Sequence, residues 1–221
     1  MTDLKSRILA TVAPDLSVIE EELKRQLKPQ LELVGEVAGH ILFAGGKRLR
    51  PLLLVLAARL CGYRGDYAAT FSVSLEYLHA ATLIHDDLVD GSPMRRGREA
   101  AHRIYGPATA VLVGDFLLAR ALSLAAGTGN IAIIEVVAGI TENMSQGEIH
   151  QLARKGDLGL TEEEYRQVIW RKTAVLFEGA CKVAALLAGA PPREVEALAA
   201  YGTHLGMAFQ MADDLIDYLS D

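Results

Sequence analysis

Residues Leu83–Gly97 read LIHDDLVDGSPMRRG, which places three carboxylates at the end of an apolar stretch and two arginines directly after it. The pattern predicts one long helix over 66–90, ended by the turn residues 91–93. On such a helix Asp86 and Asp90 face the same side, where like charges repel and the helix dipole adds to the repulsion. A divalent cation that bridges the carboxylates relieves this repulsion, and Mg²⁺ prefers oxygen ligands. For this motif alone, a solvated helix end is the simpler interpretation.

A second motif near the end of the chain has the same DDxxD spacing. It lies in FQMADDLIDY, residues 209–218, among apolar side chains. Its polar residues follow the i, i+3, i+4, i+7 pattern of one helical face: Gln210, Asp213, Asp214 and Asp217. Two matching acidic motifs in an apolar chain are hard to attribute to solubility. Facing each other across a cavity, they would hold several Mg²⁺ ions that share their coordination with a diphosphate.

Basic residues gather at three places that suit an anion. GGKRLRP, residues 45–51, combines a glycine turn with Lys47, Arg48 and Arg50, which favours either a phosphate site or a solvated basic loop. Arg95 and Arg96 follow the first acidic motif, where they either neutralise it or bind an anion. A further cation and hydroxyl pair, Lys172 and Thr173, lies in the apolar segment IWRKTAVLF, where snorkelling to the surface is the alternative.

Composition excludes several classes of protein. The 221 residues carry a formal net charge of −6, which argues against a general nucleic-acid binder. Cys61 and Cys181 lie in apolar surroundings without the spacing of a zinc site, so both are expected to be buried, reduced thiols. The N-terminus lacks the layout of a signal peptide, and the longest apolar run, residues 51–58, is too short for a bilayer. These features predict a cytoplasmic protein without a transmembrane segment.

The helical signals predict one all-α domain over residues 1–221, without strands. Alanine and leucine dominate, and apolar and polar residues do not alternate for long. Thr161 and Glu164 form the sequence pattern of a capping box. The expected helices start at Asp15 or Ser17 with a break or kink at Pro29, at Pro51, at Asp66, at Pro107 (ending at Ala126), at Ile131 (ending at Ala153), at Thr161, at Pro191–Pro192 (short), and finally over 202–218.

The chain closely resembles the trans-isoprenyl diphosphate synthases, also called polyprenyl synthetases, of the medium- and long-chain type such as octaprenyl or heptaprenyl diphosphate synthase. Five motifs carry the resemblance and occur in the family's order: GGKRLRP, LHAATLIHDDLVDGSPMRRG, SQGEIHQL, RKTAVLF and GMAFQMADDLIDY. The resemblance implies an isoprenoid-synthase-type bundle of antiparallel helices around a central apolar cavity. It also implies a homodimer, and a long apolar product would allow loose association with a membrane.

The resemblance also implies a role for each motif residue. Up to three Mg²⁺ ions would bind with the diphosphate to Asp86, Asp90 and Asp213, supported by Asp87, Asp214 and Asp217. The allylic diphosphate, such as farnesyl diphosphate, would contact Arg95, Lys172, Thr173 and Gln210. Isopentenyl diphosphate would contact Lys47, Arg50, His79 and Arg96. The catalytic set would be Asp86, Asp87, Asp90, Lys172, Asp213 and Asp214.

The implied reaction ionises the allylic C–O bond and joins the allylic cation to isopentenyl diphosphate. Small residues stand one turn before Asp86, namely Ala80, Ala81 and Thr82, so a product longer than geranylgeranyl diphosphate is expected, and Ala81→Phe is expected to shorten it.

Two alternatives to this enzyme remain open. GGKRLRP disfavours a terpene cyclase, which needs no isopentenyl site. The chain ends four residues after Asp217, whereas the family pattern continues with a lysine-bearing loop and further helices. The missing C-terminal helices leave open a non-catalytic subunit or an inactive fragment.

Overall fold

The structure is a computed structural model that describes residues 4–156 and 159–219. Helices make up nearly all of its regular structure, which confirms the predicted all-α class. The described residues form two compact units. The first unit comprises residues 4–55 and 65–129, and the second comprises 56–64, 130–156 and 159–219.

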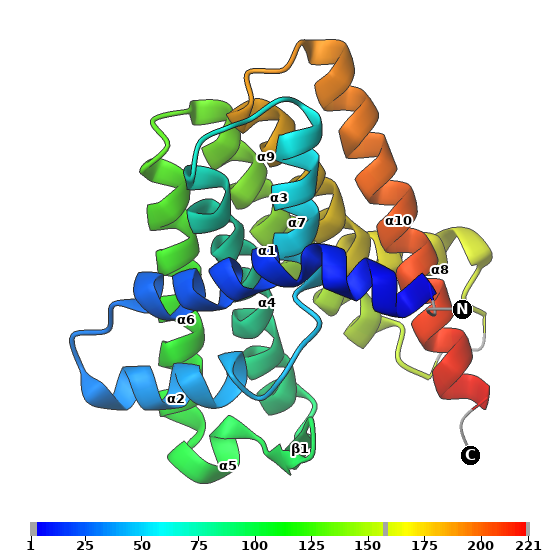
Figure 1. Cartoon of the computed structure of the whole chain (residues 1–221). Helices are drawn as coiled ribbons and strands as arrows, with labels where there is room; N and C mark the ends of the chain where they lie inside the picture. Colours follow the sequence, from blue (N-terminus) through cyan, green and yellow to red (C-terminus); the bar gives the residue numbers. More distant parts are fainter. Residues whose placement is uncertain (1–3, 157–158, 220–221) are drawn as a thin grey trace. The chain divides into compact units, whose positions relative to one another are not determined.

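The first unit is built around one buried helix. Its elements are α1 (Leu4–Leu27), α2 (Glu32–Leu42), the first part of α3 (Leu49–Leu60), α4 (Tyr67–Val89), a hairpin of β1 (Met94–Arg95) and β2 (Arg98–Glu99), α5 (Ala101–Tyr105) and α6 (Pro107–Ala126). Every residue of the α4 segment 71–78 is buried, so this helix is covered on all sides, as its nearly continuous apolar sequence requires. Figure 1 shows α1 lying across α4, where the Tyr77 hydroxyl donates to the Leu23 carbonyl at 2.8 Å.

In the second unit, one long C-terminal helix packs closely against its neighbours. Its elements are α7 (Ile131–Ala153), α8 (Glu162–Ile169), the π-helical turn η1 (Trp170–Ala174), α9 (Val175–Leu187) and α10 (Pro192–Leu219). Figure 1 shows α10 passing beside α9. A Cβ atom on Gly202 would lie 2.5 Å from the Phe177 carbonyl oxygen, and one on Gly206 would lie 2.5 Å from the Ala174 Cα. These glycines therefore allow backbone to approach backbone.

The sequence predicted most helix ends correctly. The limits of α6 and α7 agree with the prediction, and the chain leaves the helical conformation around Pro29 as expected. At the start of α8 the predicted capping box is present, because Thr161 Oγ1 accepts from the Glu164 amide at 3.2 Å and the Glu164 carboxylate accepts from the Thr161 amide at 3.0 Å. Cys61 and Cys181 are free thiols. Cys181 is buried as expected, which raises its pKa to about 12, whereas Cys61 is only half-buried, so its predicted burial was wrong.

Three predictions about the helices and strands were wrong. α1 begins at Leu4 instead of Asp15 or Ser17 and continues through Pro14, because buried Val12 lies on the same helix before the proline. The segment after Pro191 forms the single helix α10 instead of two, because its interior glycines are used for close packing. The hairpin of β1 and β2 was not predicted, since the two strands have only two residues each.

One described helix is long and apolar enough to cross a membrane by length and composition alone. This is α6, with a mean hydropathy of 1.6 over its most apolar window, 39% of which is buried inside the protein. The expectation of no such segment rested on uninterrupted apolar runs and overlooked α6, whose run is interrupted by Asp115 and Arg120. Within the first unit Arg120 donates two hydrogen bonds to the Gln26 carbonyl of α1, at 2.7 and 3.1 Å. Core helices of folded proteins pass the same test of length and composition.

Candidate active site

The first aspartate motif ends α4 with its carboxylates on different sides. Asp86 and Asp90 lie on one face, half-buried and exposed respectively, whereas Asp87 is only 1% exposed. Asp87 Oδ1 accepts from Arg95 Nε at 2.8 Å and also from Arg95 Nη2, and Asp87 Oδ2 is buried without a hydrogen-bond donor. The hydrogen bond to Asp87 raises the pKa of the Arg95 guanidinium against the opposing effect of burial, and the charges of Asp86 and Asp90 raise it further. The middle aspartate is therefore an internal anchor for Arg95.

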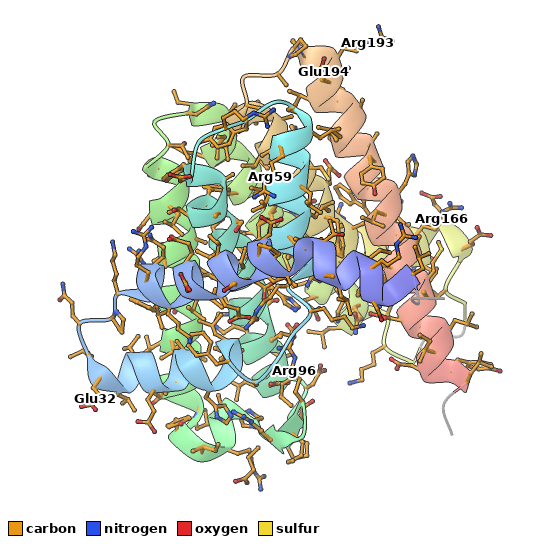
Figure 2. All side chains as sticks on the ribbon, viewed as in Figure 1. Glu32, Arg59, Arg96, Arg166, Arg193 and Glu194 are labelled. Atoms are coloured by element: carbon orange, nitrogen blue, oxygen red, sulfur yellow. The ribbon has the colours of Figure 1, made fainter. Side chains whose placement is uncertain are left out.

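The hairpin holds the two arginines that follow this motif. Met94 pairs with Glu99 and Arg95 with Arg98, and the turn residues Arg96 and Gly97 have φ of 50° and 76°. Two consecutive positive φ angles are typical of the type I′ turn, which fits the twist of a hairpin. The turn directs Arg96 to the Gly45 carbonyl, and Figure 2 shows Arg96 beside the loop after α2.

The GGKRLRP loop divides its basic residues between two roles. Arg48 is buried and donates to Glu20 Oε1 at 2.6 Å, to Glu76 Oε2 at 3.0 Å and to the Leu42 carbonyl at 2.6 Å. It therefore ties the loop to α1 and α4. Lys47 is exposed and Arg50 is half-buried, so these two are more accessible to a ligand.

Positive charge converges on His79 of α4. Burial lowers the pKa of His79 well below 6.5, and the nearby guanidiniums of Arg50, Arg96, Arg95 and Arg48 lower it further. Burial and the charges of Arg48 and Arg95 likewise lower the pKa of Arg96, although Glu76 opposes them. The first unit thus brings the charges of Arg50, Arg95 and Arg96 close to His79. The resemblance assigns His79, Arg50 and Arg96 to one diphosphate and Arg95 to the other, and these assignments stay predictions. A cluster of guanidiniums is suitable for an anion.

The second aspartate motif lies on α10 among uncharged donors. Asp214 Oδ2 accepts from the Tyr165 hydroxyl at 2.6 Å, and Asp214 Oδ1 accepts from Gln210 Nε2 at 2.8 Å. Gln210 Oε1 in turn accepts from Thr173 Oγ1 at 2.5 Å. Asp213 is half-buried and Asp217 is exposed. The second unit therefore brings three of the predicted residues into one network, namely Thr173, Gln210 and Asp214.

Lys172 points to α7 instead of this network. Its Nζ lies 2.7 Å from Glu148 Oε1 and 2.9 Å from Gln151 Oε1. A Cβ atom on Gly147 would lie 2.9 Å from Arg171 Cβ, so the glycine of SQGEIHQL lets α7 approach η1 closely. The close approach brings the two acceptors within reach of Lys172.

Sequence reasoning missed several residues of these clusters. Glu148 and Gln151 lie in a motif that was recognised only as a resemblance. For Arg48 the sequence left a phosphate site and a solvated basic loop as alternatives. In the structure Arg48 is buried and pairs with Glu20 and Glu76, which are too distant in sequence to be identified from spacing. Tyr165 left no signal in the sequence, because its partner Asp214 lies 49 residues later on another helix.

The carboxylates fit a cation that is shared with a substrate. Among residues 4–156 and 159–219, no three His, Cys, Asp or Glu side chains lie close enough to hold a metal ion by themselves. Mg²⁺ in phosphate-transfer sites takes one or two carboxylates and completes its coordination with water and substrate phosphates. Asp86 and Asp90 on α4 are such a donor set, and Asp213, Asp214 and Asp217 on α10 supply the carboxylates of a second one.

The second unit also contains a cavity of about 290 Å³ between α7 and α9. Its lining includes Glu135, Trp170, Glu178 and Lys182, and none of the predicted site residues. This cavity therefore does not correspond to the central apolar cavity that the resemblance implies, which stays a prediction.

Comparison with known proteins gives consistent matches along the chain. A family model described as polyprenyl synthetase matches residues 31–221. Octaprenyl diphosphate synthase from Escherichia coli is 41% identical over 215 residues, which are 97% of this chain and 67% of that protein. An all-trans-nonaprenyl-diphosphate synthase (geranyl-diphosphate specific) from Rhodobacter capsulatus is 41% identical over 99% of this chain and 67% of its own length.

The fold of the chain also matches those of solved structures. A crystal structure of polyprenyl synthase from Caulobacter crescentus CB15, complexed with calcium and isoprenyl diphosphate, superposes with a TM-score of 0.92 and 41% identity. The match covers 97% of this chain and 66% of that one. The chain thus spans about two thirds of the length of the relatives that it matches.

Proposed function

Because the chain belongs to the polyprenyl synthetase family, we propose that it is an Mg²⁺-dependent prenyltransferase that condenses isopentenyl diphosphate with an allylic diphosphate. The observation that carries the proposal is the convergence of Arg50, Arg95 and Arg96 on His79, next to the acidic end of α4. An anion-binding cluster beside carboxylates suits a reaction between two diphosphates, of which one is held through cations and the other directly by arginines.

In this proposal, different groups of residues bind the two diphosphate substrates. Mg²⁺, when bound, would neutralise the charge that develops on the leaving diphosphate. Lys47, Arg50 and Arg96 would hold isopentenyl diphosphate, and Lys172 and Thr173 would contact the allylic diphosphate. Lys172 then exchanges its partners Glu148 and Gln151 for phosphate oxygens.

The proposed reaction needs no strong side-chain base, because the released diphosphate takes the proton. The allylic C–O bond breaks and diphosphate leaves with the electron pair. The double bond of isopentenyl diphosphate attacks the allylic carbon, a C–C bond forms, and the proton that is lost goes to the released diphosphate. Apolar walls would protect the cation from water.

The product is proposed to be longer than geranylgeranyl diphosphate. The relatives from E. coli and R. capsulatus are named octaprenyl and nonaprenyl diphosphate synthases, and this chain has Ala80 and Ala81 one turn before its first motif. Both alanines are buried in α4, so a larger side chain there would take up interior space.

We also propose a homodimer, on the basis of the family resemblance alone, and a cytoplasmic location, on the basis of the sequence features described above. Light scattering is expected to give twice the mass of one chain, and the mass of a single chain would contradict the dimer. After cell fractionation the protein is expected in the soluble fraction, and firm retention by membranes would contradict the location.

Product analysis tests the reaction. The chain is incubated with Mg²⁺, isopentenyl diphosphate and farnesyl diphosphate, and mass spectrometry is expected to detect elongated prenyl diphosphates.

Arg50→Met is expected to raise the KM for isopentenyl diphosphate at least about tenfold, since a hydrogen bond to a charged group is worth about 1.5–3 kcal/mol. Arg64→Met, which changes an exposed arginine outside the cluster, is the matched control. No elongation by the chain alone, followed by turnover only with an added synthase chain, would favour the non-catalytic subunit.

A further inference from the structure

We propose that Tyr165 is a positioning residue, which orients the Asp214 carboxylate for a divalent cation in the second aspartate motif. The inference rests on the proposed function. It concerns a residue outside both aspartate motifs and outside every substrate contact named above.

Tyr165 and Gln210 together occupy both oxygens of Asp214. The Tyr165 hydroxyl donates to Oδ2 at 2.6 Å, and Gln210 Nε2 donates to Oδ1 at 2.8 Å. A carboxylate with both oxygens hydrogen-bonded cannot rotate without breaking one of these bonds. The pair of donors therefore fixes the carboxylate plane.

Both donors are uncharged, which leaves the charge of Asp214 available. A guanidinium or ammonium at the same place would cancel that charge and compete with a metal ion. A carboxylate has about four lone-pair sites, so one hydrogen bond to each oxygen leaves acceptor capacity on both.

Helix α8 holds Tyr165 from its first turn. Thr161 and Glu164 form the capping box that starts the helix, and Arg154 also contacts the Glu164 carboxylate. The hydrogen bonds from Thr161 lower the pKa of Glu164, which therefore stays ionised in this role. Tyr165 is the next residue, so its backbone is set by the cap.

The π-helical turn η1 brings Thr173 into the same network. On a regular α-helix, residues seven apart return to nearly the same face, whereas residues eight apart do not. A π turn accommodates one extra residue, so Tyr165 and Thr173, eight apart, both reach the face of α10 that carries Gln210 and Asp214. The hydrogen bonds run from Thr173 through Gln210 and Asp214 to Tyr165. Both end residues belong to the one continuous segment 165–173.

Metal binding tests this role without requiring turnover. Free Mn²⁺ is measured by electron paramagnetic resonance while the full chain is titrated in the presence of inorganic pyrophosphate. Residues that orient a metal ligand typically contribute about 10–100-fold to metal affinity, so Tyr165→Phe is expected to weaken Mn²⁺ binding by that factor. Tyr201→Phe on α10 removes the hydroxyl of an exposed tyrosine and is the matched control, with unchanged affinity expected.

Two further measurements separate positioning from packing. In an Asp214→Asn background, Tyr165→Phe is expected to cause no additional loss of Mn²⁺ affinity, because the two residues act through one interaction. A role in packing alone would lower the melting temperature of Tyr165→Phe and leave Mn²⁺ affinity within about twofold of the wild type, which would overturn the proposal. A wild-type chain that binds no Mn²⁺ with pyrophosphate would overturn the proposed function, and the inference with it.

Discussion

Asp87 in the first motif and Asp214 in the second occupy the same place in a DDxxD sequence, but their neighbours differ in charge. Asp87 is 1% exposed and is bound by the Arg95 guanidinium. Asp214 is half-buried and is bound by a hydroxyl and an amide. The second aspartate of the motif is therefore paired with a cation in one unit and hydrogen-bonded only to uncharged donors in the other.

The difference shows that the partner decides what a motif aspartate does. Arg95 lies eight residues after Asp87, across the turn that leads into the hairpin. Its pairing with Asp87 fixes the hairpin and with it the direction of Arg96. In the first unit the middle aspartate thus serves the anion cluster, while Asp86 and Asp90 are left as the accessible pair.

The largest expected effect is the loss of the cation in the first motif. Arg95→Met leaves Asp87 buried without a counter-charge, so the free energy of unfolding is expected to fall by about 3 kcal/mol, at the low end for buried pairs because Arg95 is partly exposed. Asp214→Asn in the second motif removes no buried ion pair and is expected to cost only about 1 kcal/mol. Urea denaturation of both variants measures the contrast.

A second substitution isolates the uncompensated charge. Asp87→Asn added to Arg95→Met is expected to recover part of the lost stability, because the remaining buried group is then neutral. Arg95→Lys keeps the charge and is expected to lose less than Arg95→Met. Equal stability of Arg95→Met and the wild type would show that the pair contributes nothing.

The second motif is expected to depend on helix packing instead of an ion pair. Gly206 lies four residues before Gln210, and a Cβ there would meet the Ala174 backbone at 2.5 Å. Gly206→Ala is expected to cost about 2 kcal/mol, as overpacking typically does, and to weaken the contact between Thr173 and Gln210. Thermal and urea denaturation measure the loss.

Gly139→Ala is the matched control for this close approach. Gly139 also lies inside a helix, but a Cβ there would meet nothing within 4 Å. The change is expected to stabilise the protein by about 0.5–1 kcal/mol, since alanine loses less backbone entropy on folding. Similar losses in both variants would remove the argument that α10 needs glycine for contact.

The sequence predicted those parts of the fold that depend on local signals. The helix over Pro107–Ala126 is opened by a proline and closed by a glycine, and the capping box of Thr161 is entirely local. The prediction wrongly started a new helix at Gly202, because from local sequence alone a glycine is a weak point in a helix. In the folded chain Gly202 and Gly206 stabilise tertiary packing, since backbone atoms of other helices approach them closely.

The site was predictable in its residue types but not in its pairings. The acidic and basic motifs indicated diphosphate chemistry, and the cluster around His79 contains the predicted arginines. Three pairings depend on how helices pack and left no periodic signal, namely Arg48 with Glu20 and Glu76, Lys172 with Glu148, and Tyr165 with Asp214. The π turn η1 was equally hidden, because its sequence WRKTA also suits an α-helix.

The last prediction separates the two motifs by pH. His79, near the first motif, has a pKa well below 6.5 in the folded chain, with burial as the main cause and four arginines as the next. Above pH 6.5 the residue is neutral in both the folded and the unfolded chain, so its contribution to stability is fully present. As the pH falls through 6.5, the unfolded chain binds a proton that the folded chain does not bind, and stability is lost by at most about 1.4 kcal/mol per pH unit.

His79→Gln is expected to remove this part of the pH dependence, measured as the difference in unfolding free energy between wild type and variant from pH 7 to 5. His204→Gln, at an exposed position on α10, is expected to keep it. Pyrophosphate is expected to flatten the wild-type curve, because a bound anion supplies the counter-charge that a protonated His79 otherwise lacks. An identical slope for wild type and His79→Gln would mean that neither burial nor the arginines lower the pKa of His79. The contrast between a cationic first motif and a neutral second one would then rest on Arg95 alone.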